Sequence, residues 1–187
     1  MSGACAQLCP SAQPEMRGAQ AFGVVSGAPD ERRVTWIERP VPVTPELLAM
    51  SAPVPPTRVM RFAARCQESA CSHFDGHDCR LASRIVAMLD PVVAALPPCS
   101  IRADCRWWRQ EGREACSRCP QIITETVDPP AIYERAATPE PKAGMEEADT
   151  GRAAANLQDD AASFPPIHAI EADRLEKKVP LDRIAIC

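Results

Sequence analysis

Polar and apolar residues alternate, or β-branched residues gather, in three short stretches that predict β-strands. Residues 34–38 read Val-Thr-Trp-Ile-Glu, a β-branched and aromatic run of the kind enriched in strands. Residues 58–63 alternate, which places Arg61 and Phe62 on opposite faces of a short strand. Residues 121–127 are again rich in Ile, Thr and Val, and a further strand is expected there.

A helical period replaces this alternation in two other places. The range Cys79–Leu89 carries four apolar residues on one helical face, namely Leu81, Ile85, Met88 and Leu89. Residues 102–111 form a second, shorter helical pattern. Gly112 follows at the place where glycine commonly ends a helix, so we expect the second helix to stop there.

Prolines interrupt the chain between the first two predicted strands. Six prolines fall within residues 39–57, and we expect this range to be an extended linker that packs on the core through Leu47 and Leu48. Thr44 followed by Pro45 is typical of a helix start, since threonine caps the first turn and proline suits its first position. One helical turn is therefore expected inside the linker.

These elements predict a small α or α+β domain with little regular structure over residues 58–128. Residues 1–57 are expected to form a mostly disordered, proline-rich arm whose one short strand is 34–38. Residues 129–187 are rich in proline, alanine and acidic side chains, and a disordered tail is expected there. The chain of 187 residues has 20 prolines, about twice the usual share.

The expected core is thin, which makes the cysteines important. Aromatic residues make up only 4% of the chain, and a domain of roughly 65 residues usually needs a staple. Seven of the ten cysteines lie within residues 58–124. We therefore expect sulfur ligands on a metal centre to supply the missing stability.

The strongest ligand pattern lies at the end of this segment. Cys99, Cys105, Cys116 and Cys119 supply four thiolates, and the last two form a Cys-x2-Cys pair followed by Pro120. Two cysteines at this spacing can direct both sulfurs at one centre, as in zinc sites and iron–sulfur sites. Proline directly after the last ligand is common in bacterial ferredoxin motifs.

A second group is one ligand short of four. Cys66, Cys71 and Cys79 would be completed by His73 or by His77, and His73 is favoured because it lies beside Cys71. Seven cysteines and one histidine would serve two four-coordinate centres. One centre with three spare cysteines fits the same count. Cys5 and Cys9, in the N-terminal arm, are interpreted as incidental thiols or as an accessory ligand pair.

Part of the first pattern resembles a known cluster motif. Asp104-Cys105-x10-Cys116-x2-Cys119 is similar to Cys-Cys-x10-Cys-x2-Cys, the C-terminal motif of ferric-siderophore reductases, which holds a [2Fe–2S] cluster. Asp104 stands at the first ligand, so Cys99 would have to substitute from another position. The resemblance implies that this spacing tolerates an iron–sulfur cluster. The number of cysteine ligands suits a [2Fe–2S] or a [4Fe–4S] cluster, and zinc is the alternative cofactor.

The leading functional hypothesis is an iron–sulfur protein that carries electrons or senses redox state, with a protein redox partner. Trp107 and Trp108 would shield its centre from water. The alternative is a zinc-binding module that contacts protein or nucleic acid through the arginines of residues 102–113. Residues 58–119 carry a charge of only +3, with ten arginines against seven acidic side chains, which supports nucleic-acid binding weakly.

The sequence contains no motif of a self-contained enzyme. It has no phosphate-binding glycine loop, no nucleophile elbow and no His-Glu-x-x-His helix. A role as an accessory subunit of a redox enzyme stays open. No membrane span or secretory signal is recognised, so a cytoplasmic location and no membrane partner are expected. A reducing cytosol would favour metal binding over disulfides.

Overall fold

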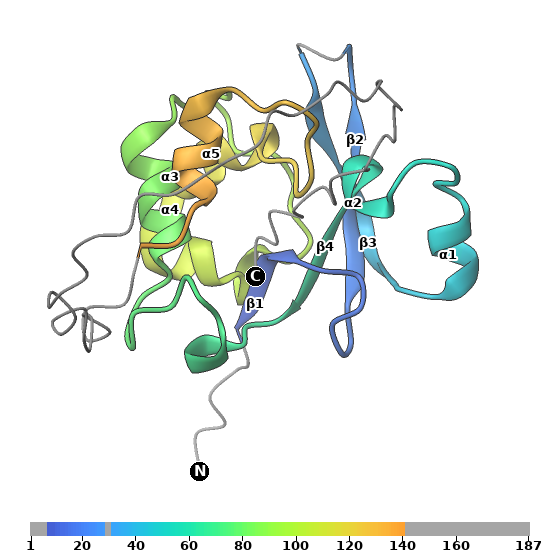
Figure 1. Ribbon diagram of the computed structural model, residues 1–187, viewed down its shortest axis with the longest axis horizontal. Coiled ribbons are helices and arrows are strands. Elements are labelled where there is room, and N and C mark those ends of the chain that lie inside the picture. The colour runs from blue at the N-terminus through green and yellow to red at the C-terminus, as the bar shows by residue number, and fades with distance from the viewer. Residues whose placement is uncertain (1–6, 29–30, 141–187) are drawn as a thin grey trace, which may run out of the picture. The chain divides into compact units, whose positions relative to one another are not determined.

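The computed structural model describes residues 7–28 and 31–140, and these form an α+β fold. Its sheet has four antiparallel strands in the order β1-β4-β2-β3 (Figure 1). The strands are β1 (Leu8–Ala12), β2 (Gln20–Ser26), β3 (Arg33–Pro42) and β4 (Met60–Arg65). Of the two predicted classes, α and α+β, the fold is α+β, with more regular structure than expected, and the strand expected at 34–38 lies within β3.

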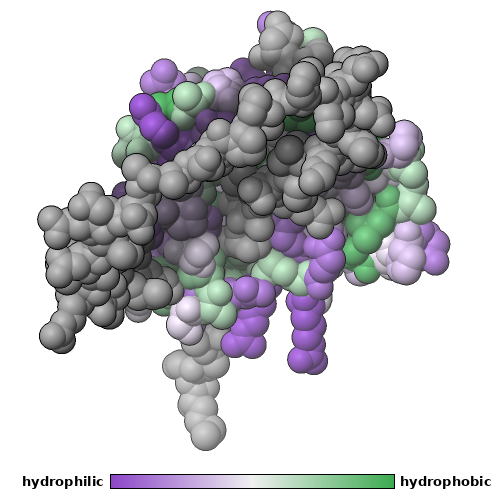
Figure 2. All heavy atoms as spheres, in the orientation of Figure 1, coloured by the Kyte–Doolittle hydropathy of each residue, from purple (hydrophilic) through white to green (hydrophobic). Residues whose placement is uncertain are grey.

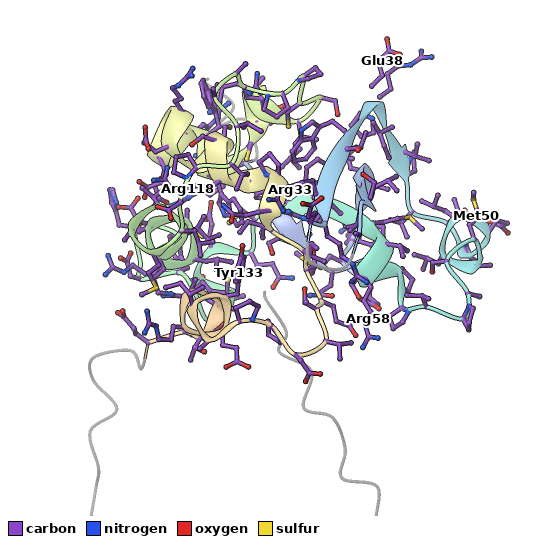
Figure 3. The ribbon with its side chains drawn as sticks, turned by 90° about the horizontal axis from the view of Figure 1, so that it is seen from above. Arg33, Glu38, Met50, Arg58, Arg118 and Tyr133 are labelled. Carbon is purple, nitrogen blue, oxygen red and sulfur yellow. The ribbon has the colours of Figure 1, made fainter. Side chains whose placement is uncertain are left out.

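Five helices accompany the sheet. They are α1 (Pro45–Ala49), α2 (Pro56–Val59), α3 (Arg80–Met88), α4 (Arg106–Arg118) and α5 (Ala131–Ala137). Three short 3-10 turns lie between them: η1 (Glu68–Ala70), η2 (Arg102–Asp104) and η3 (Cys119–Gln121). Helices α3, α4 and α5 gather on one side of the sheet and α1 on the other; Figure 3 shows Arg118 and Tyr133 on the helical side and Met50 at the far end, beyond the sheet.

Strand β4 has two faces because successive side chains of a strand point in opposite directions. Met60 and Phe62 face the α1 side, where Leu47 and Leu48 pack against them, as the sequence predicts. The predicted cap of α1 is also present, since the Thr44 side chain accepts a hydrogen bond from the backbone N–H of Leu47. The proline-rich linker is therefore folded onto the sheet.

The opposite face of the sheet turns toward the helices. Phe22 and Ala63 pack there with Ile101, and Phe22 stacks on Trp36 at a centroid distance of 5.4 Å. Arg61 lies on the same face and is fully buried. A charged side chain inside the protein is costly without a partner, so this residue bears directly on what the interior holds.

The helical side has its own apolar core. It is built around Trp107 and consists of Leu81, Ala82, Ile85, Leu89, Ala115 and Ile122, together with Cys79 and Cys105. Three of these residues lie on the face of the helix predicted from the sequence over Cys79–Leu89, which forms as α3.

Helix α4 is broken at Gly112. This residue has φ 57° and ψ −133°, a conformation open to glycine and strained for other residues, so two short helices meet at this position. The first of them ends where the sequence predicts. The second brings Cys116 back toward the chain that precedes the first.

Two expectations about order and strands are wrong, and a third differs from the structure only at its first residues. Residues 1–57 are not mostly disordered where described, because β1, β2 and β3 pair with one another or with β4 and bury small side chains. Residue 121 ends η3, and residues 122–127 form bends and irregular backbone instead of a strand. The expected tail from residue 129 begins with α5, and residues 141–187 lie outside the described part of the chain.

Exposed apolar side chains mark the α1 side of the fold. Met50 is 80% exposed and Val54 is 40% exposed, and apolar colouring marks this side in Figure 2. Within the described residues, no helix combines the length and the apolar character that crossing a membrane would require.

Candidate metal centres

Eight cysteines line two separate pockets, four in each. The first cysteine pocket contains Cys99, Cys105, Cys116 and Cys119. The second cysteine pocket contains Cys9, Cys66, Cys71 and Cys79.

The first cysteine pocket brings together all four residues of the strongest predicted pattern. Cys99 precedes η2, Cys105 lies between η2 and α4, Cys116 lies in the last part of α4, and Cys119 begins η3. The four sulfurs are close enough to interact electrostatically when ionised. The charges of Cys99 and Cys116 raise the pKa of Cys119, and the charges of Cys116 and Cys119 raise the pKa of Cys105. Apolar groups such as Phe22, Trp36 and Ile101 form much of the remaining wall.

Backbone amides are already directed at sulfur in this pocket. The N–H groups of Ile101 and Arg102 hydrogen-bond Cys99, and those of Trp107 and Trp108 hydrogen-bond Cys105. Cys105 precedes the first turn of α4, whose N–H groups have no partner inside the helix. Such donors stabilise the thiolate over the thiol, which a metal ligand requires.

The second cysteine pocket depends on strand pairing. Cys9 is opposite Ala64 in the β1–β4 ladder, and the backbone N–H of Cys66 donates to the Gln7 carbonyl at 2.8 Å. Cys9 and Cys66 are therefore diagonal neighbours on one face of the two strands. Cys71 follows η1, and Cys79 precedes the first residue of α3.

The predicted histidine ligand does not line this pocket, and Cys9 is the fourth cysteine of its wall. His73 is 1% exposed and its Nδ1 lies 2.8 Å from a guanidinium nitrogen of Arg84. Burial, together with the charge of Arg84, lowers the pKa of His73 to about 4. The other candidate, His77, is 91% exposed in its side chain and lies beside Asp78.

Cys9 could not be assigned from spacing along the chain. It is 57 positions before Cys66 in a stretch that looks disordered, and only the pairing of β1 with β4 brings the two together. Only the cysteine count pointed to an eighth ligand. Two sets of four ligands need one more than the seven clustered cysteines, and Cys9 is one of the three cysteines outside the cluster.

Trp107 separates the two pockets and lines both. Its side chain is 1% exposed, and its indole N–H has no hydrogen-bond partner among the described residues. The side chain thus lies inside the protein, between the two pockets. Trp108 is half-buried beside Arg102, whose guanidinium carbon lies 5.6 Å from the ring centroid.

Three arginines surround the pockets. Arg61 is 0% exposed, donates to the Pro10 carbonyl at 2.6 Å and to the carbonyl of Ile122, and hydrogen-bonds the sulfur of Cys119. Within residues 7–28 and 31–140, no carboxylate lies at ion-pair distance from it. Arg102 hydrogen-bonds the sulfur of Cys116. The charge of Arg106 acts on Cys66.

The arginines expected to form a binding face are thus partly used inside the protein. Arg106 is only 8% exposed, and its guanidinium contacts Gln7 and the carbonyl of His77. Arg102 turns toward the first cysteine pocket, whereas Arg109 stays at the surface beside Asp104 at 3.5 Å.

Burial keeps the thiols protonated when no cation is bound. It raises the pKa of Cys79 to about 11 and that of Cys119 to about 11, and it raises the pKa of Cys105 further. A bound metal reverses this preference because it binds thiolate and releases the proton. Binding at either pocket is therefore linked to deprotonation.

The cysteines of each pocket face a hollow without closing on one point. Among the residues that the structure describes, no three Cys, His, Asp or Glu side chains lie as the ligands of a single metal ion would.

Comparisons with protein-family models, with curated proteins and with solved structures found no match to this chain.

Proposed function

We propose that this chain is an iron–sulfur protein that holds one cluster in each cysteine pocket and serves as an electron carrier or redox sensor. The observation that carries the proposal is the division of eight cysteines into two sets of four, each around its own hollow. Four cysteines are the ligand set of [4Fe–4S] and [2Fe–2S] clusters.

The spacing of the cysteines favours a cluster over zinc. Zinc–sulfur bonds of about 2.3 Å would draw four sulfurs to within roughly 4 Å of one another. A cluster binds its thiolates through separate iron atoms and leaves inorganic sulfide between them, so it suits cysteines that stand apart around a hollow.

The buried charge of Arg61 supports an anionic occupant. A fully buried guanidinium is costly unless it is paired, and Arg61 meets carbonyl oxygens and a cysteine sulfur instead of a carboxylate. A cluster with four thiolate ligands carries net negative charge. It would supply the missing counter-charge at Cys119.

Complete cysteine ligation supports electron transfer over catalysis. Catalytic metal sites keep one coordination position open for water or substrate, whereas closed sites do not. With four cysteines in each pocket, every position would be filled by protein. The apolar wall around the first cysteine pocket, with Phe22 and Trp36, would also limit access of solvent to the centre.

Metal analysis of the full chain, purified without oxygen, tests the proposal. Two [4Fe–4S] clusters predict about eight iron and eight sulfide per chain, and two [2Fe–2S] clusters predict about four of each, with visible absorption that reductant bleaches. Cys105→Ser should remove the centre of the first cysteine pocket alone. Colourless protein with stoichiometric zinc and no acid-labile sulfide would refute the proposal and support the zinc alternative.

A further inference from the structure

Resting on the proposed function, we propose that the two centres form an electron-transfer pair with a fixed direction. The second cysteine pocket holds the centre of lower potential, and one electron passes from it across Trp107 to the centre in the first cysteine pocket. The first cysteine pocket is then the exit to a one-electron acceptor protein.

The two pockets are neighbours through both a side chain and the backbone. Trp107 lines both of them, and Arg106, the residue before it, lines the second. A β-bridge joins Leu8 to Cys105, so the residue before Cys9 pairs with a cysteine of the other pocket. An electron would therefore move through packed protein groups without entering solvent.

Two arginines place positive charge on the first cysteine pocket. The charge of Arg61 favours the thiolate form of Cys119 and Cys99, and the charge of Arg102 favours that of Cys116 and Cys99. Within the described ranges neither forms an ion pair with a carboxylate. Positive charge and hydrogen bonds to the sulfurs stabilise the reduced, more negative cluster, which raises its potential.

The arginine on the wall of the second cysteine pocket is partly neutralised. Arg106 lies 3.8 Å from the carboxylate of Asp78, which offsets its charge on Cys66. With less net positive charge beside its sulfurs, the reduced and more negative cluster is stabilised less in the second pocket, so the second centre has the lower potential.

The electrons balance as follows. The reduced centre in the second cysteine pocket loses one electron and returns to its oxidised state. The oxidised centre in the first gains that electron. A one-electron donor protein returns an electron to the second centre. In the test, dithionite takes the place of this donor protein.

A redox titration of the full chain, followed by electron paramagnetic resonance, measures both potentials. We expect two midpoints, with the higher one absent in Cys105→Ser and the lower one absent in Cys9→Ser. At full reduction, magnetic interaction between the neighbouring centres should broaden the spectrum. Both single-centre variants should lose this broadening.

Arg102→Gln then tests the origin of the difference. We expect it to lower the potential of the first centre alone, so that the equilibrium constant for electron sharing changes by roughly tenfold, or about 59 mV for one electron. Arg109→Gln is the matched control, because Arg109 belongs to the same charged segment but pairs with Asp104 at the surface.

The outcomes separate the two proposals. A chain without iron and sulfide would end the proposed function itself. Two clusters with equal potentials, with the order reversed, or with Arg102→Gln acting no more than Arg109→Gln would leave the proposed function standing and overturn the directed pair.

Discussion

Cys9 is the residue on which the division into two four-cysteine pockets depends. It lies in β1 and is 5% exposed, although the segment Leu-Cys-Pro-Ser-Ala around it has little strand propensity. Its position opposite Ala64 follows from a strand pairing between segments more than 50 residues apart. Spacing rules read local sequence, so they identified the first cysteine pocket completely and the second only in part.

The first prediction concerns this residue. Cys9→Ser should halve the iron and sulfide bound per chain, because a hydroxyl replaces one of four thiolate ligands in a single pocket. Elemental analysis after anaerobic reconstitution measures the effect. Cys5→Ser is the matched control and should leave both contents unchanged; equal losses in the two variants would exclude Cys9 as a specific ligand.

Arg61 gives a second prediction, since an anion in the first cysteine pocket would supply the counter-charge that its carbonyl and sulfur contacts do not. Arg61→Met should lower the free energy of unfolding of the loaded protein by about 3–5 kcal/mol, the usual cost of breaking a buried charge pair. The loss should be smaller in the metal-free protein, where the guanidinium has no counter-charge.

Chemical unfolding of the loaded and metal-free forms under reducing, oxygen-free conditions compares the two costs. Arg65→Met, on the same strand but exposed, controls for the loss of an arginine. An equal loss in both forms would show that Arg61 stabilises the fold through its carbonyl contacts alone.

The thiols give a third prediction, on pH. Burial raises the pKa of Cys79 and of Cys119 to about 11 in the metal-free fold, so above their unfolded pKa, near 9, the folded chain holds more protons than the unfolded chain. The stability contributed by these groups is complete below about pH 9 and is lost as the pH rises through about 11.

Thermal unfolding of the reduced, metal-free protein between pH 8 and 11 should therefore show a falling midpoint. In the double variant with Cys79→Ala and Cys119→Ala the decline should be smaller, since neither group can then titrate. A decline of the same size in this variant would assign the pH dependence to other groups.

At the scale of elements, α4 connects the two pockets. Cys105 precedes it, Trp107 lies in its first turn, and Cys116 lies beyond the break at Gly112. The break is needed because a straight helix would carry Cys116 away from Cys105, about 1.5 Å per residue. The sequence predicts the stop at Gly112 but not that a second helix follows at once.

Gly112→Ala is accordingly the fourth prediction. A Cβ meets no atom within 4 Å, so the cost comes from backbone strain at φ 57° and should be about 1–3 kcal/mol of unfolding free energy. The visible absorption of the first centre should weaken as Cys105 and Cys116 move apart. Gly18→Ala, at φ 70° in the β1–β2 turn, is the control and should cost stability without changing that absorption.

Helices and strands differed in how far their sequences predicted them. Helix α3 and the first half of α4 carry their period locally, so pattern alone locates them. Strand β1 reads Leu-Cys-Pro-Ser-Ala, which has little strand propensity, and it forms because β4 supplies its partner. Residues 121–127 show the opposite case. Their composition is typical of a strand, but no strand of the described residues lies beside them to pair with, so none forms.

At the scale of the whole molecule, the described fold has small, separate apolar clusters and two pockets lined by cysteine. Three of these clusters consist of only three buried residues each. Centres bound in the pockets would tie β1, the loop after β4, α3 and α4 together. Binding and folding should then be coupled.

The fifth prediction follows from this coupling. Removing the centres with a strong chelator and reductant should lower the unfolding midpoint markedly and reduce the cooperativity of the transition, as monitored by circular dichroism. Reconstitution with iron and sulfide should restore both. A metal-free chain that unfolds at the same midpoint as the loaded one would show that the centres do not hold the fold together.

Native mass spectrometry of the full chain, purified without oxygen, tests the central claim most directly. Two clusters predict a mass above that of the polypeptide by about 700 Da for two [4Fe–4S] centres, or about 350 Da for two [2Fe–2S] centres. Cys9→Ser should show half of that increment. An increment of about 65 or 130 Da, as for one or two zinc ions, or no increment at all, would contradict the claim.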